Sequence, residues 1–207
     1  MNTRTSSRRL TVNLLAFTGG FVIMSVELMG GKLLAPYFGS GVYIWGSIIS
    51  VFMVALSVGY LLGGRLTMRW VSLKVYGSVF LIGGLTLVPL VMTAQPVLEW
   101  VFQRIEDPRY GSLVASTALF FVPTVVLGMI SPYSVRLLVR HADESGRVAG
   151  TLYFVSTLGS GLGTLITSFY LVLWFEINTV LIGLSAALLL AGGWALSLGV
   201  RASEPAR

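Results

Sequence analysis

The sequence predicts an all-α polytopic membrane protein with six transmembrane helices. Hydrophobic residues make up 55% of its 207 residues and charged residues only 11%, whereas soluble domains average about 25% charged residues. The apolar residues come in successive blocks of about 20, the length that crosses a hydrocarbon core about 30 Å thick. No block shows the alternation of a barrel strand, so each is expected to be a helix that satisfies its own backbone hydrogen bonds. A soluble enzyme is thereby excluded.

The first three spans follow a basic N-terminal tail. Pro36 disfavours a helical backbone at Leu34 and Ala35, and Gly39 and Gly41 permit a sharp turn into the second span. These spans are expected at about 10–31, 43–64 and 73–94.

The last three spans follow a longer connection, Gln95–Tyr110. Trp100 in this connection is predicted to lie at headgroup depth on a short interfacial helix. Pro123 and Pro132 are expected to kink or interrupt the fourth span and to free carbonyls that could line a cavity or a hinge. The spans are expected at about 111–135, 150–173 and 178–200.

The basic residues predict the orientation of these six spans. Only Lys32, Arg104 and Arg109 fall on one side of the membrane. Because Lys and Arg are enriched in cytoplasmic loops, we expect both termini in the cytoplasm, across the inner membrane of a bacterium. The eleven residues on the cytoplasmic side are Arg4, Arg8, Arg9, Arg65, Arg69, Lys74, Arg136, Arg140, Arg147, Arg201 and Arg207.

Small residues recur at four-residue spacing, which places them on one helix face and permits close backbone approach. Gly59 and Gly63 form such a pair in the second span, and Gly159 and Gly163 form one in the fifth. The fifth span adds a hydroxyl stripe, for which a substrate path is the alternative to a buried packing seam. The stripe consists of Ser156, Ser160, Thr164 and Ser168.

Glu27 is the acidic residue within the expected spans. An ionised carboxylate within the membrane is costly unless it is paired, so Glu27 is expected to face the bundle interior. There it could bind Lys32 or a tyrosine of the following loop, or it could bind a substrate. Tyr37, Tyr43 and Trp45 are expected nearby at the outer mouth, where a carboxylate and aromatic faces could bind an organic ammonium. An interfacial aromatic belt is the alternative for these aromatics.

A second candidate set lies on the predicted cytoplasmic side, where it could contact a partner or form a gate. The alternatives are topology determinants, lipid headgroup contacts and irregular helix packing. The set consists of Arg65, Arg69, Ser131, Pro132, Arg136, Arg140 and Arg147.

Metal and cofactor sites are not expected. The chain has no cysteine and one histidine, His141, which excludes disulfides, thiolate metal sites and multi-histidine sites. His141 is expected in a solvated loop. The net charge of +6 is distributed as a topology signal, so nucleic acid is not an expected partner.

Four strings of the chain are, in order, ELMGGKLLAPYFGSGVYIW, SVGYLLGGRLTMR, GMISPYSVRLL and GRVAGTLYFVSTLGSGLGTLITSFYLVL. In order and spacing they resemble the membrane domain of fused spermidine synthase-like proteins, the membrane-bound polyamine aminopropyltransferase group. This membrane domain is in turn similar to half of a major facilitator transporter. In the turn between the second and third spans, Gly64 stands where the transporter motif has an acidic residue.

The resemblance implies a membrane module without its own catalysis. In the family the membrane part is followed by a soluble aminopropyltransferase domain, which has no counterpart before Arg207. One hypothesis is a module that acts with a separate cytosolic aminopropyltransferase-like or methyltransferase-like enzyme in polyamine metabolism, and it is slightly favoured. A second is a homodimeric carrier of a small organic cation such as a polyamine. A third is a structural subunit of a larger membrane complex.

Overall fold

The computed structural model describes residues 3–139 and 141–201, and the side chains of residues 7–139 and 141–199. Six helical segments of this part are long and apolar enough to cross a membrane, and no strand occurs in it. The all-α prediction with six candidate spans is therefore confirmed. The helices are α1 (Thr3–Phe38), α2 (Val42–Arg69), α3 (Leu73–Arg104), α4 (Pro108–Gly128), α5 (Ile130–Leu138), α6 (Ser145–Ile166), α7 (Val172–Trp174) and α8 (Ile177–Arg201).

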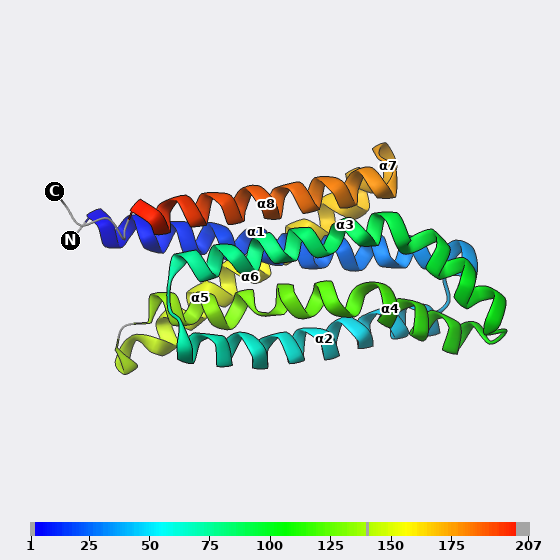
Figure 1. The fold of residues 1–207 in the computed structure, drawn as a ribbon, viewed down its shortest axis with the longest axis horizontal. Helices are drawn as coiled ribbons and strands as arrows, with labels where there is room; N and C mark the ends of the chain where they lie inside the picture. Colours follow the sequence, from blue (N-terminus) through cyan, green and yellow to red (C-terminus); the bar gives the residue numbers. More distant parts are fainter. Residues whose placement is uncertain (1–2, 140, 202–207) are drawn as a thin grey trace.

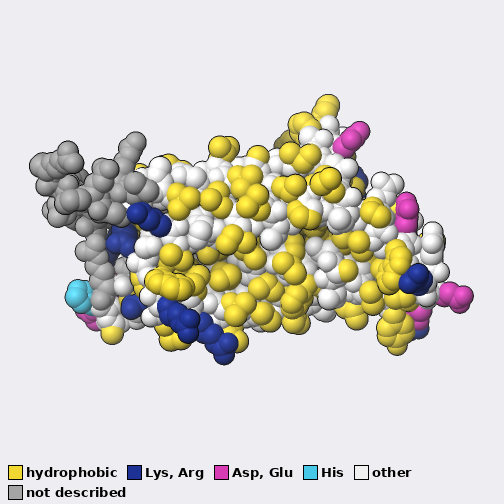
Figure 2. Space-filling model, in the orientation of Figure 1, with side chains coloured by type: hydrophobic (Ala, Val, Ile, Leu, Met, Phe, Trp, Pro, Cys, Tyr) yellow, Lys and Arg dark blue, Asp and Glu magenta, His cyan; other side chains and the backbone are white. Residues whose placement is uncertain are grey.

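The helices form an elongated bundle in which the start of α1 and the end of α8 lie at the same end (Figure 1). The closest partners are α3 with α8, α1 with α6, and α2 with α4. We call the end where α2 meets α3 the basic end, because Arg65, Arg69, Lys74, Arg136 and Arg147 lie there, and the other end the opposite end. Hydrophobic side chains cover the middle, and Lys and Arg gather mainly at the basic end (Figure 2).

The helices are longer than the sequence suggests, and two expected interruptions are wrong. Helix α1 continues through Pro36 to Phe38, and α3 continues through Pro96 to Arg104, over most of the expected connection Gln95–Tyr110. Each proline removes only one backbone donor, and buried Leu98 and Val101 hold this part of α3 against the core. The turn after α1 does use Gly39, which has φ +87.

The fourth span is nearly continuous. Pro123 lies inside α4 without ending it, and the helix is interrupted at Met129 before α5 begins. Pro132 falls in the first turn of α5, where its missing N–H would be free in any case. The predicted interruption is therefore absent at Pro123 and present just before Pro132.

Two short features set the ends of the later helices. Asp107 caps α4 by accepting a hydrogen bond from the Arg109 N–H at 2.9 Å, and hydrogen bonds from the Arg109 side chain lower the pKa of the Asp107 carboxyl. At the basic end, the 3₁₀-helix Ala142–Glu144 precedes α6. His141 before it is exposed, as expected of a loop residue.

Tyr133 ties the connection between α2 and α3 to α5. Its buried ring stacks on Tyr76 at 5.5 Å, and its hydroxyl donates to the Trp70 carbonyl at 2.7 Å and accepts from the Ser72 N–H at 3.2 Å. The neighbouring Tyr76 hydroxyl pairs with Ser134 at 2.5 Å.

The variant Tyr133→Phe is expected to lower the free energy of unfolding by about 1–3 kcal/mol, because it leaves two backbone groups without a partner. Unfolding in a denaturing detergent measures this loss. The variant Tyr110→Phe, whose side chain is 64% exposed, is the control and should change little. Equal stability of the two variants would contradict the assigned role of Tyr133.

Candidate functional site

A cavity of about 460 Å³ opens between α1, α2, α5 and α6. Helices α2 and α6 stand on its two sides and hardly touch each other. The span that contains α6 is the least buried of the six, so the cavity lies on an open face of the bundle. We call this cavity the central cleft.

The wall of the central cleft carries six hydroxyl groups. The hydroxyls of Ser131, Ser156 and Thr157 have no hydrogen-bond partner among the described residues. The Ser160 hydroxyl donates to the Gly20 carbonyl at 3.2 Å. Tyr60 of α2 and Tyr153 of α6 line the same cleft from its two sides. The cleft therefore offers free donors and acceptors beside an apolar wall. The hydroxyls belong to Tyr60, Ser131, Tyr153, Ser156, Thr157 and Ser160.

Glu27 lies on the helix face that borders this cleft. A Cβ at Gly20 would lie 2.1 Å from the Ser156 carbonyl of α6, and one at Gly31 would lie 2.5 Å from the Trp45 ring of α2. Glu27 follows Gly20 by seven residues and precedes Gly31 by four, so all three share one face of α1. Glu27 is half-buried, and its carboxylate has no ion-pair or hydrogen-bond partner within the described chain.

The other predicted outer residues separate into different places. Lys32 does not pair with Glu27; its ammonium donates to the Val172 carbonyl at 3.1 Å. Tyr37 packs edge-on against Phe102, and Tyr43 is exposed at the start of α2. Neither tyrosine meets Glu27, because α1 stays helical past Pro36 and directs these residues away. Of the three predicted aromatics, only Trp45 lies near Glu27.

The seam between α1 and α6 is built mainly from glycines. Added Cβ atoms at Gly159 and Gly163 would lie 2.3 and 2.5 Å from the carbonyls of Phe17 and Phe21. One turn further, Thr167 donates to the Ser25 hydroxyl at 2.8 Å.

The predicted hydroxyl stripe of α6 runs beside this seam. Ser156, Ser160 and Thr164 are half-buried along its edge. Ser168 is exposed, which corrects the prediction that it belongs to the seam. The π-helix Thr167–Leu171 begins at this point and changes the periodicity.

The predicted cytoplasmic set is split between the cleft and the surface. Ser131 and Pro132 line the central cleft. Arg140 lies outside the described residues. The remaining members, Arg65, Arg69, Arg136 and Arg147, are exposed.

Sequence reasoning missed Tyr60, Tyr153 and Thr157. The spacing of Tyr153, Thr157 and Ser160 places them on one helix face, a signal that was available. Tyr60 carries no such signal, because its place opposite Tyr153 depends on how α2 and α6 are arranged in space.

No group of three potential metal ligands occurs in the described part of the chain. No protein-family model, curated protein or solved structure matches the chain.

Proposed function

We propose that the chain is a membrane carrier module that binds a small organic cation, such as a polyamine, in the central cleft. The observation that carries this proposal is the unpaired Glu27 carboxylate on the same face of α1 as a cavity lined by free hydroxyls. A carboxylate attracts an ammonium group, and hydroxyl and aromatic side chains such as Trp45 can complete its coordination.

The open side of the cleft suggests a second copy of the chain. A half-buried carboxylate and free hydroxyls are costly against lipid, because hydrocarbon offers them no hydrogen bonds. Two copies that face each other through α2 and α6 would enclose these groups between two six-helix units, as carriers with a midplane site require. The substrate would then lie between the two Glu27 side chains.

Transport in proteoliposomes tests the binding role of Glu27. Purified protein should take up labelled spermidine, and Glu27→Gln should reduce the uptake at least tenfold, because removal of one charge-assisted contact costs more than about 1.4 kcal/mol. Glu106→Gln is the matched control, since Glu106 is an exposed carboxylate at the opposite end. Equal uptake by the two variants would overturn the proposal.

Cysteine cross-linking tests the homodimer. Because the chain has no native cysteine, the variant Gly161→Cys places a single thiol on the exposed face of α6, where a Cβ meets no neighbour. Oxidation in native membranes should give a covalent dimer. The control Gly183→Cys is also exposed but lies on α8, and it should stay monomeric. A covalent dimer of Gly183→Cys but not of Gly161→Cys would place the interface away from α6.

A second candidate function is that of a membrane module that acts together with a cytosolic aminopropyltransferase-like enzyme. It is favoured by the four exposed arginines at the basic end, Arg65, Arg69, Arg136 and Arg147, none of which forms an ion pair within the described residues. Purification from native membranes should then retain such an enzyme, and substitution of the four arginines by glutamine should release it. Recovery of the chain without any enzyme would contradict this function.

A further inference from the structure

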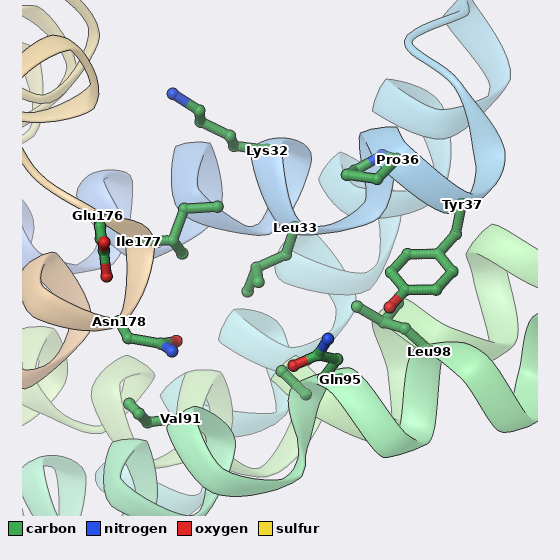
Figure 3. Close-up of a pocket in the computed structure, with 11 residues that line it drawn as sticks. Lys32, Leu33, Pro36, Tyr37, Val91, Gln95, Leu98, Glu176, Ile177 and Asn178 are labelled. Carbon is green, nitrogen blue, oxygen red and sulfur yellow. The ribbon is translucent and has the colours of Figure 1, made fainter.

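A second cavity, of about 520 Å³, lies at the opposite end between α1, α3 and the start of α8. Gln95 and Asn178 direct their amides into this space, and the Tyr37 hydroxyl points toward it from α1 (Figure 3). Lys32 and Glu176 lie at its rim and contribute one charge of each sign. We call this the outer cavity.

Most of the polar groups of the outer cavity are free to bind a ligand. The side chains of Gln95, Glu176 and Asn178 have no hydrogen-bond partner among the described residues, although the Glu176 backbone carbonyl accepts from the Val180 N–H. Lys32 uses one N–H on the Val172 carbonyl, which leaves two of its three donors. Lys32 and Glu176 also form no ion pair with each other within the described chain. The cavity therefore presents a cation and an anion separately, beside two amides.

The remaining wall of the outer cavity is apolar. Leu33, Val91 and Leu98 line it. On the same helix α3, the exposed Trp100 holds the Arg104 guanidinium over its ring at 4.4 Å, a combination typical of the membrane interface. A polar rim above an apolar wall at this depth fits an amphipathic ligand better than a free solute.

We propose that the outer cavity binds the headgroup of a zwitterionic phospholipid with a primary ammonium, such as phosphatidylethanolamine. The lipid phosphate lies near Lys32, and the ammonium donates hydrogen bonds to Glu176 and to the amide oxygens of Gln95 and Asn178. A quaternary ammonium has no N–H to donate, so a choline headgroup binds more weakly. The presence of Lys32 distinguishes this site from the cation site proposed in the central cleft.

Native mass spectrometry of the full chain in detergent tests the proposal. Phosphatidylethanolamine, phosphatidylcholine and phosphatidylglycerol with identical acyl chains are titrated separately, and free phosphoethanolamine is a fourth ligand. We expect phosphatidylethanolamine to bind at least threefold more tightly than the other three. Glu176→Gln should remove this preference, and Glu106→Gln, an exposed control at the same end, should retain it.

Asn178→Leu is a second variant that leaves both charges in place, and it should weaken phosphatidylethanolamine binding by a similar factor. Equal binding of all three lipids would overturn the proposal. Binding of free phosphoethanolamine as tight as that of the lipid would also overturn it, because the site would then bind a soluble zwitterion and not a lipid. An unchanged preference in both variants would place the lipid elsewhere. Thermal unfolding of each variant verifies that it is folded.

Discussion

Replacement of Gly159 by leucine is expected to leave little folded protein. A Cβ at this position would lie 2.3 Å from the Phe17 carbonyl oxygen of α1, a backbone atom that cannot turn aside. Helices α1 and α6 would have to separate, and the contacts at Gly163 and Thr167 would be lost with them. We expect a loss of about 3 kcal/mol or more in the free energy of unfolding.

The control for this variant is Gly183→Leu on α8, outside the proposed dimer interface. A Cβ at Gly183 meets no neighbour within 4 Å, so the change should stay within about 0.5 kcal/mol. Leucine is more apolar than glycine, so neither variant should impair membrane insertion. Detergent-induced unfolding of purified protein compares the two. Similar losses for both would mean that α1 and α6 do not meet through Gly159.

The helices could be predicted because their signal is local. Blocks of about 20 apolar residues predicted six spans, and the described part of the chain contains six candidate spans. The predicted helix ends were less accurate than the helices themselves, because a proline is a weak signal for the end of a helix. Pro36 and Pro96 stay inside helices whose neighbouring residues pack on the core, whereas the interruption at Met129 precedes Pro132.

The arrangement of the candidate site could not be predicted from local patterns. Glu27 was identified because a carboxylate in an apolar span is costly. Its surroundings depend on which helices flank that face of α1, and those helices bring Ser156 and Tyr60 toward the same cleft. Lys32 is close to Glu27 in sequence, but five residues correspond to 500° around the helix, so the two side chains point in different directions.

Replacement of Gly59 by leucine is the second change with a large expected effect. A Cβ at Gly59 would lie 2.3 Å from the Val125 carbonyl oxygen and 2.8 Å from the Gly128 Cα. Helix α2 would have to move away from α4 close to the interruption at Met129. We expect a loss of about 3 kcal/mol or more in the free energy of unfolding. Gly64→Leu, where a Cβ meets no neighbour, is the control and should unfold like the unsubstituted protein.

The smaller change Gly59→Ala links this packing contact to the central cleft. In the cleft wall, Leu56 of α2 lies about one turn before Gly59 and Tyr60 directly follows it, and Leu127 lines the wall from α4. A small outward shift of α2 would therefore move Tyr60 away from Tyr153 and widen the cleft while the bundle stays folded. If the cleft binds an organic cation, Gly59→Ala should weaken spermidine binding more than Gly64→Ala does. Binding by isothermal titration, compared at matched folded fraction, would separate this effect from instability. Equal affinities would show that the width of the cleft does not determine binding.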